Sequence, residues 1–221
     1  MGRISVDNPN NPASAMISLN SFRYFAGKPD CSLLKTCIEK DLILVPHNDM
    51  WEDMICAVLP DAKKNVRYAV HCDQGFDANK LALFIHELPC GFQIQKIDKT
   101  LYYQCLQNDF FKDFVSNFKN ADHFLQTGLG YVITKKGTIV SGASSFCCYP
   151  GGIEIEVDTD LFYRRRHLAE AACSALIMEC LSRCIYPNWD AMNTASLALS
   201  KKLGYQFTKE YAVYITKERV H

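Results

Sequence analysis

The sequence lacks long hydrophobic runs and lacks an excess of charge of either sign. A membrane-spanning helix needs about 20 consecutive apolar residues, and no stretch of the 221 residues approaches that length. Lys and Arg together number 24, as do Asp and Glu, so the formal net charge is zero. Proteins that bind nucleic acid through their overall charge usually carry a basic excess. We therefore expect neither a nucleic-acid partner nor a membrane partner.

Signals for secretion, lipidation and metal binding are also missing. The opening residues, MGRISVDNPN, contain no apolar signal-peptide segment, and Val6 stands where a myristoylation signal requires Ser or Thr. The 11 cysteines include no Cys-x-x-Cys pair, and the histidines are scattered without metal-ligand spacing. We expect a cytoplasmic protein without a metal site, in which most cysteines are small buried hydrophobic residues.

The order of the expected elements predicts two parts. Strand-like and helix-like segments alternate up to about residue 90, where the stretch LPCG at 88–91 marks a break. Residues 1–90 are therefore expected to form a small α/β unit. Residues 91–221 read as helices and a meander of strands, followed by a strand-loop-helix crossover. Because a crossover joins parallel strands, we predict a mixed, mostly antiparallel sheet flanked by helices, an α/β (α+β) fold.

A run of three arginines, Arg164–Arg166, opens the helical pattern that continues to Cys184. Cations are unfavourable at a helix N-terminus, which attracts anions through its dipole and its free backbone N–H groups. One explanation is a bound polyanion such as a phosphate; the other is a charged, solvated first turn. The helix from Leu168 to Leu181 is apolar on most of its circumference, so we expect it in the core, where it would hold such a site rigidly.

Residues 164–169, RRRHLA, resemble the pyrophosphate-binding signature Arg/Gln-x-x-Gly-x-Gly/Ala of the GNAT superfamily of N-acetyltransferases. The segment 186–205, YPNWDAMNTASLALSKKLGY, resembles the strand and helix that follow the signature. Over nearly the whole chain the pattern is similar to the zwittermicin-A-resistance-type branch, through segments 6–15, 25–30, 67–77, 113–132, 139–146 and 153–159.

The resemblance implies a splayed mixed sheet with acetyl-CoA in the gap beside the strand IEIEVDT. Residues Val157, Asp158 and Thr159 would line the coenzyme, with Val157 and Thr159 offering backbone groups to the acetyl carbonyl and the pantetheine. The backbone amides of Arg164, Arg165, Arg166, His167, Leu168 and Ala169 would hold the pyrophosphate. Asn193 and Ser196 would contact the pantetheine or its surroundings.

Acetyl transfer to an amine needs a base that takes the amine proton and a donor for the carbonyl oxygen. Glu154 and Glu156 are the best candidates for the base, because the strand beside the acetyl group presents them. Two other roles stay open for them: solvent-facing carboxylates that pair with lysines, and binders of a cationic substrate amine.

Two positions depart from the superfamily pattern. His167 replaces the Gly of the signature's fourth position, where a side chain can crowd a phosphate. Ser200 stands where many members have the Tyr that protonates the leaving thiolate. Tyr205 and Tyr211 lie nearby in the sequence, and the identity of the acid stays open.

The leading hypothesis is an N-acetyltransferase that moves an acetyl group from acetyl-CoA to a primary amine of a small molecule or peptide. The resemblance allows a small aminated metabolite or antibiotic as acceptor, and residues 1–90 would then shape the acceptor side. A homodimer is compatible with it. The alternative is a CoA-binding sensor or scaffold module without turnover.

Overall fold

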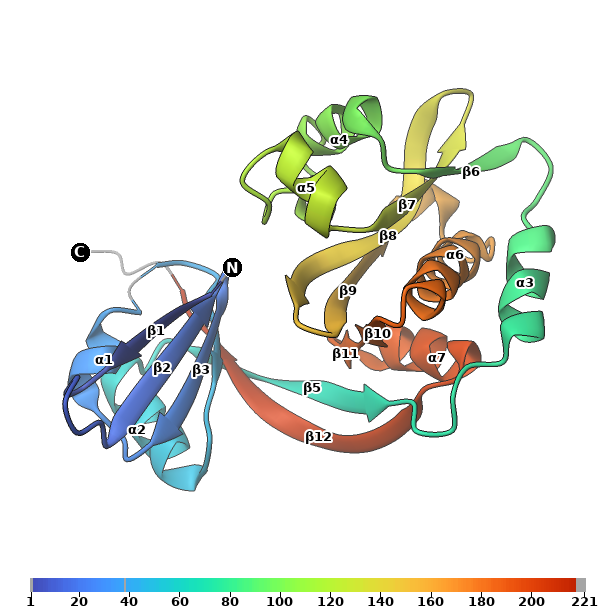
Figure 1. Ribbon diagram of the computed structural model, residues 1–221. Coiled ribbons are helices and arrows are strands. Elements are labelled where there is room, and N and C mark those ends of the chain that lie inside the picture. Colours follow the sequence, from blue (N-terminus) through green and yellow to red (C-terminus); the bar gives the residue numbers. More distant parts are fainter. Residues whose placement is uncertain (1, 38, 218–221) are drawn as a thin grey trace. The chain divides into compact units, whose positions relative to one another are not determined.

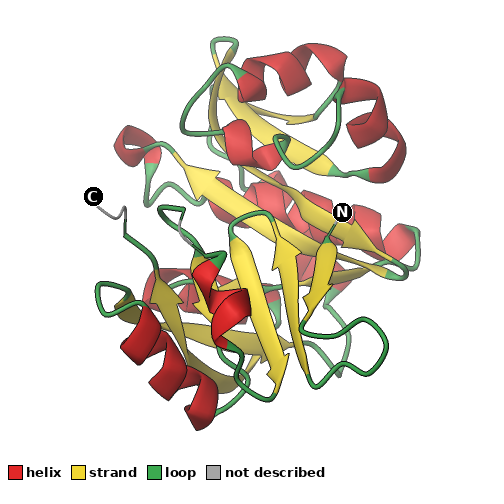
Figure 2. Ribbon diagram, turned by 90° about the vertical axis from the view of Figure 1, so that its left-hand side faces the viewer, coloured by secondary structure: helices red, strands yellow, loops and turns green. Residues whose placement is uncertain are grey.

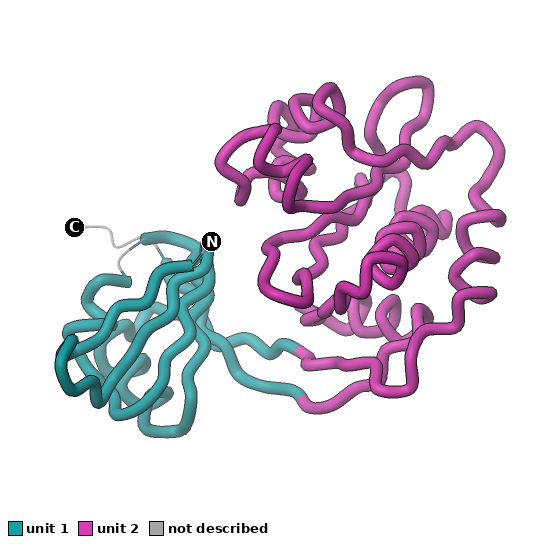
Figure 3. The backbone as a smooth tube through the Cα atoms, viewed as in Figure 1, with its two compact units in different colours: residues 1–67, 210–221 teal, residues 68–209 magenta. Residues whose placement is uncertain are grey.

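The chain forms two units, which Figure 3 shows in different colours: unit 1 comprises Met1–Arg67 and Glu210–His221, and unit 2 comprises Tyr68–Lys209. The computed structural model describes residues 2–37 and 39–217. The division differs from the one expected near residue 90. Strand β5 (Lys63–His71) leads from unit 1 into unit 2, and strand β12 (Gln206–Ile215) leads back (Figure 1). The C-terminal strand belongs to unit 1 because Tyr214 and Ile215 pair with β4, a long-range pairing that local patterns cannot show.

Unit 1 is a small sheet with two helices. Its elements are β1 (Arg3–Val6), β2 (Ser14–Leu19), β3 (Phe22–Gly27), α1 (Cys31–Lys35), β4 (Ile43–Val45) and α2 (Asp49–Val58). Trp51 of α2 is fully buried and stacks on Phe25 of β3, with ring centroids 4.6 Å apart. Strand β1 is held by antiparallel pairing with β2.

Unit 2 is built around a five-stranded sheet with the order β10-β9-β8-β7-β6. Figure 2 shows the strands of the chain in yellow and its helices in red. Strand β10 is parallel to β9 and the other neighbours are antiparallel, which confirms the mixed, mostly antiparallel sheet. Strand β11 instead joins β5, in the ladder ordered β1-β2-β3-β4-β12-β5-β11. The elements of unit 2 after β5 and before β12 are α3 (Ala78–His86), β6 (Phe92–Lys96), α4 (Lys99–Leu106), the 3-10 helix η1 (Lys112–Phe114), α5 (Ala121–Thr127), β7 (Gly130–Lys135), β8 (Thr138–Tyr149), β9 (Gly152–Thr159), the 3-10 helix η2 (Leu161–Tyr163), α6 (Leu168–Ser182), β10 (Tyr186–Asn188), β11 (Asp190–Ala191) and α7 (Thr194–Leu203).

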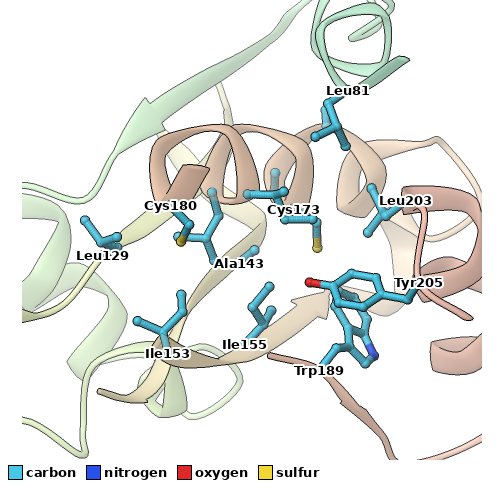
Figure 4. Packing of buried hydrophobic residues seen from close by; sticks show 14 of the residues in the cluster. Leu81, Leu129, Ala143, Ile153, Ile155, Cys173, Cys180, Trp189, Leu203 and Tyr205 are labelled. Atoms are coloured by element: carbon cyan, nitrogen blue, oxygen red, sulfur yellow. The ribbon is translucent and has the colours of Figure 1, made fainter. Parts of the chain in front are cut away.

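The helix α6 forms the centre of the main core, as its apolar circumference predicted. Cys173 and Cys180 of α6 are fully buried among side chains from β8, β9 and α3, including Ile153, Ile155 and Leu81 (Figure 4). Burial raises the pKa of the Cys180 thiol to about 12, so this cysteine stays protonated at neutral pH. Six of the 11 cysteines are buried in this way: Cys37, Cys72, Cys105, Cys147, Cys173 and Cys180. Among the described residues, no helix is both long and apolar enough to cross a membrane.

Glu179, near the end of α6, joins that helix to the sheet. Its carboxylate accepts hydrogen bonds from Lys96 Nζ of β6 and Tyr131 Oη of β7, both at 2.5 Å, and it pairs with Arg183. Its side chain is only 12% exposed. Burial acts to raise the pKa of Glu179, but the bonds from Lys96 and Tyr131, with the charges of Lys96 and Arg183, bring it below 4.5.

Replacing Glu179 with glutamine is expected to lower the free energy of unfolding by about 1–3 kcal/mol at pH 7, because a charged acceptor is lost from a nearly buried network. A carboxyl whose pKa is depressed by folding stabilises the protein above the unfolded pKa, and this stabilisation is lost as the pH falls through the folded value. Urea unfolding at pH 7 and at steps below pH 4.5 should therefore show a difference between wild type and Glu179→Gln that shrinks with acidity. The exposed Glu87→Gln serves as control; a difference that is independent of pH would contradict the account.

Candidate functional site

The five-stranded sheet opens between β9 and β10. The two strands pair only where Tyr186–Asn188 face Gly152–Glu154. After Asn188 the chain passes into β11, where Asp190 pairs with Ala69 of β5. Strand β9, however, continues beside β8 as far as Thr159, which pairs with Ser141. The two neighbouring strands therefore diverge, and from Ile155 onward β9 has an edge that β10 does not cover.

The register shows which backbone groups point to this open edge. Asp160 N donates to Val140 O (2.9 Å), so this pair is hydrogen-bonded across β8 and β9. Such pairs alternate along an antiparallel ladder, so Val157 and Thr159 direct their N–H and C=O groups away from β8. The contacts of Thr159 agree, because its N–H donates to Asp158 Oδ1 (2.7 Å) and its carbonyl accepts from Arg164 Nε (3.1 Å). Val157, whose backbone is expected to contact the acetyl carbonyl, lies two residues before Thr159 and faces the same edge.

The arginines stand before the helix and are not part of its first turn. Helix α6 begins at Leu168, while Arg165 has a φ of 62° and Arg164 is extended. The left-handed conformation at Arg165 prevents the helix from starting earlier, which a pattern of residue types alone did not reveal. The backbone N–H groups of the first turn, Leu168 to Glu170, have no acceptors within the helix. These donors follow directly after the loop that leaves the open edge of β9, and they fit an anionic group.

His167, which stands where the superfamily signature has glycine, has a backbone conformation that favours glycine. Its φ of 62° and ψ of 12° are left-handed, a region in which a side chain is normally disfavoured. The imidazole Nδ1 lies 3.0 Å from Glu170 Oε2, and Glu170 Oε1 also accepts from Lys202 Nζ of α7 (2.7 Å). Burial acts to raise the pKa of Glu170, but the bonds from Lys202 and His167 hold it below its usual value. The His167 side chain therefore contacts its own helix, and its backbone keeps the left-handed conformation that favours glycine.

Comparing two substitutions isolates this conformation. Both His167→Gly and His167→Ala remove the bond to Glu170, but only alanine keeps a Cβ in the left-handed region. We expect His167→Gly to be more stable than His167→Ala by about 1 kcal/mol in chemical denaturation. Equal stabilities would mean that the left-handed conformation is absent in solution.

The carboxylates of β9 alternate with its core residues and so share the opposite face of the strand. Glu154 Oε2 accepts from Asn188 Nδ2 at 2.5 Å, at the last β9–β10 pair. Glu156 comes two residues later, where the strands have diverged, and is half-buried. Burial raises the pKa of Asp158. The hydrogen bond from Thr159 N and the charge of Arg164, whose guanidinium lies 3.6 Å away, act to lower it but do not outweigh burial. Asp158 therefore anchors Arg164 to the end of the strand.

Two residues expected near the pantetheine, Asn193 and Ser196, organise the start of α7. Asn193 is the N-cap, and its Oδ1 accepts from Ser196 N (2.9 Å). Ser196 Oγ accepts from the indole Nε1 of the buried Trp189 (3.1 Å). Both residues lie at the start of the helix, as predicted, and their contact with a ligand stays a prediction.

Two of the groups considered as thiolate acid, Ser200 and Tyr205, are engaged elsewhere. Ser200 is fully buried and its Oγ donates to Leu197 O (2.9 Å). Tyr205 is also buried, and its hydroxyl donates to Pro187 O (2.5 Å). Burial raises the pKa of Tyr205 well above 10. Neither hydroxyl is therefore placed to protonate a thiolate in this arrangement.

The contacts of Glu170 were not predicted from the sequence. The spacing of His167 and Glu170, three residues apart across the start of a helix, was the available signal for their contact. No comparable signal pointed to the ion pair between Glu170 and Lys202.

Among the described residues, no group of three or more His, Cys, Asp or Glu side chains is arranged to hold a metal ion. The site features that the structure shows are an open strand edge, a helix N-terminus with adjoining arginines, and strand carboxylates.

Comparisons with known proteins agree with this arrangement. The family model described as GNAT acetyltransferase matches residues 1–214. The crystal structure of a GCN5-related N-acetyltransferase-like protein from Streptococcus suis 89/1591 is 43% identical, with a TM-score of 0.95 over 98% of this chain and 89% of that chain. A GCN5-related N-acetyltransferase from Kribbella flavida, 15% identical, shares the fold with a TM-score of 0.63 over 100% of this chain and 91% of its own.

Among curated proteins, the uncharacterized N-acetyltransferase YdfB of Bacillus subtilis (strain 168) is 24% identical over 179 residues, which are 79% of this chain. The match spans 66% of the length of YdfB, just under two thirds. Together with the splayed sheet and the helix start behind the arginines, the family match over almost the whole chain shows that this protein belongs to the GNAT acetyltransferase family.

Proposed function

We propose that the protein transfers an acetyl group from acetyl-CoA to a primary amine, carried by a small aminated metabolite or antibiotic. The observation that carries the proposal is the divergence of β9 from β10 after Glu154, with the open strand edge leading into the N-terminus of α6. The family membership supports acetyl transfer, and the similarity to YdfB, an uncharacterized N-acetyltransferase, supports transfer to nitrogen.

The residues present fit two groups of acetyl-CoA, its pyrophosphate and its acetyl carbonyl. The first-turn amides of α6 from Leu168 to Glu170, which have no helical acceptors, suit the pyrophosphate, and Arg164 adds a positive charge beside them. The backbone of Val157 on the open edge of β9 suits the acetyl carbonyl. When bound, acetyl-CoA supplies the acetyl group as an activated thioester.

We assign three roles to the chain's own groups. The N–H of Val157 donates to the carbonyl oxygen and stabilises the negative charge that develops there during attack. Glu156, beyond the last β9–β10 pair, takes the proton that the attacking amine loses, directly or through one water. Glu154, which accepts a hydrogen bond from Asn188, binds the cationic acceptor amine. The new bond joins the amine nitrogen to the acetyl carbon, the carbon–sulfur bond breaks, and water protonates the thiolate.

A thiol-release assay with acetyl-CoA tests this function against aminopolyols, aminoglycosides, polyamines, amino acids and a lysine peptide. Turnover with one class of amine would identify both the reaction and the acceptor type. Stabilisation by CoA in thermal unfolding, without turnover across the panel, would favour the sensor or scaffold role. The zwittermicin-A-resistance branch, a cytoplasmic location, a homodimer and an acceptor-side role for the N-terminal unit stay predictions.

A further inference from the structure

A second cationic cluster lies beside the helix start, around the ring of Tyr163. Lys135 Nζ, at the end of β7, is 5.4 Å from the centre of this ring, and the guanidinium carbon of Arg166 is 5.7 Å from it. Lys135 also lies over Phe92 of β6 at 5.0 Å, and Phe92 meets Tyr163 edge-on with centroids 6.0 Å apart. Lys135 and Arg166 therefore both lie over the ring of Tyr163.

The charges of this cluster are not neutralised by carboxylates. Arg164 has Asp158 as ion-pair partner and Lys202 has Glu170, but in the described part of the chain neither Lys135 nor Arg166 lies within ion-pair distance of an Asp or Glu. Bringing like charges together is unfavourable, and cation–π contacts at exposed sites offset only part of this cost. A bound anion would remove this repulsion.

The cluster lies at the sheet end where the phosphates of the coenzyme are expected. Lys135 and Thr138 flank the tight hairpin between β7 and β8, in which Lys136 and Gly137 have φ values of 51° and 81°. The first part of β8 pairs with the last part of β9, Ser141 with Thr159, so the hairpin and the end of β9 share one end of the sheet. Arg166 stands two residues before α6, next to the amides assigned to the pyrophosphate.

We propose that Lys135 and Arg166, held on Tyr163, bind the 3′-phosphate of CoA and make the enzyme selective for CoA over 3′-dephospho-CoA. The inference rests on the proposed function, because it assumes that CoA is the ligand. The 3′-phosphate is a dianionic monoester, and one ribose separates it from the pyrophosphate. Both side chains are long and flexible enough to meet on a single phosphate group, and charge-assisted bonds to phosphate are the strong ones.

The test is calorimetric titration of CoA and of 3′-dephospho-CoA into the full chain. Wild type is expected to bind CoA roughly 10- to 100-fold more tightly than 3′-dephospho-CoA, the effect of one or two charge-assisted hydrogen bonds. Lys135→Ala with Arg166→Ala should remove this preference, because it should weaken the binding of CoA far more than the binding of 3′-dephospho-CoA. Lys119→Ala, which removes an exposed lysine outside the cluster, should keep it.

The outcomes separate this inference from the proposed function. Equal binding of both ligands by wild type would overturn the 3′-phosphate site while leaving the function in place. A double variant that loses both ligands equally would also overturn it, because the side chains would then serve the pyrophosphate. Binding of neither ligand to wild type would overturn the function and the inference together.

The ring of Tyr163 provides a second variant pair. Tyr163→Phe keeps the aromatic face and should retain the preference for CoA, whereas Tyr163→Leu removes the face and should reduce it several-fold. A merely structural role would weaken both ligands to the same extent. Equal ratios of the two affinities in Tyr163→Phe and Tyr163→Leu would show that the ring does not position the cations.

Discussion

Replacing Glu156 with glutamine is expected to slow acetyl transfer by about 100-fold or more while leaving the affinity for acetyl-CoA unchanged. Glutamine has the same size but cannot accept the amine proton. Glu156 is placed beyond the last β9–β10 pair, at the open part of the strand, and its side chain is on the face opposite the core residues Ile155 and Val157. A proton acceptor at this position acts on the amine and does not contribute to the binding of the phosphates.

Glu154→Gln is the matched comparison on the same strand. Its carboxylate is bonded to Asn188, so the substitution should weaken binding of the acceptor and raise KM more than it lowers kcat. Steady-state kinetics with the best amine of the panel, together with calorimetry of acetyl-CoA binding, distinguish the two. Undiminished kcat in Glu156→Gln would remove this residue from the role of base, and loss of acetyl-CoA affinity would point to a binding role.

A glutamate at position 169 is expected to weaken acetyl-CoA binding by at least about 100-fold while preserving the fold. Ala169 is the second residue of α6, and its N–H is one of the donors assigned to the pyrophosphate. An acidic side chain in the first turn is favourable for the helix by about 0.3–1 kcal/mol. The same carboxylate, however, would occupy the position of the phosphates and repel their negative charge. Binding and stability should therefore move in opposite directions.

Ala169→Gln controls for size, because it introduces a side chain of nearly equal volume without charge. Calorimetry should find a much smaller loss of affinity for Ala169→Gln than for Ala169→Glu, and thermal unfolding should find both variants folded. If the two variants bind acetyl-CoA equally well, the phosphates do not lie at this helix start.

Much of the site follows from local sequence. The alternation in residues 153–157 gave the strand and its two faces, and the small and polar residues around 193–204 gave a capped helix that ends at Gly204. The apolar circumference of α6 indicated its buried position, since a helix without a polar face must be covered on all sides. These features depend on neighbours within one or two turns of the chain, which residue types can specify.

Other features depend on contacts between distant segments or on single dihedral angles. The return of β12 to pair with β4 determines the division into units, and it is not encoded in any local pattern. The left-handed Arg165 and His167 move the helix start behind the arginines, although residues other than glycine adopt a positive φ only uncommonly. The contact of Lys135 with the ring of Tyr163, over which Arg166 also lies, joins a hairpin to a loop that is distant in the sequence.

The central claim is that the open edge of β9 and the first turn of α6 hold acetyl-CoA. Hydrogen–deuterium exchange of the wild-type chain, with and without saturating CoA, tests it most directly, because the amides of Leu168, Ala169 and Glu170 lack helical acceptors and should exchange quickly when no ligand is bound. We predict that CoA protects residues 157–170 of the chain and leaves unit 1 largely unchanged. No protection in this segment, or protection confined to other segments, would contradict the account.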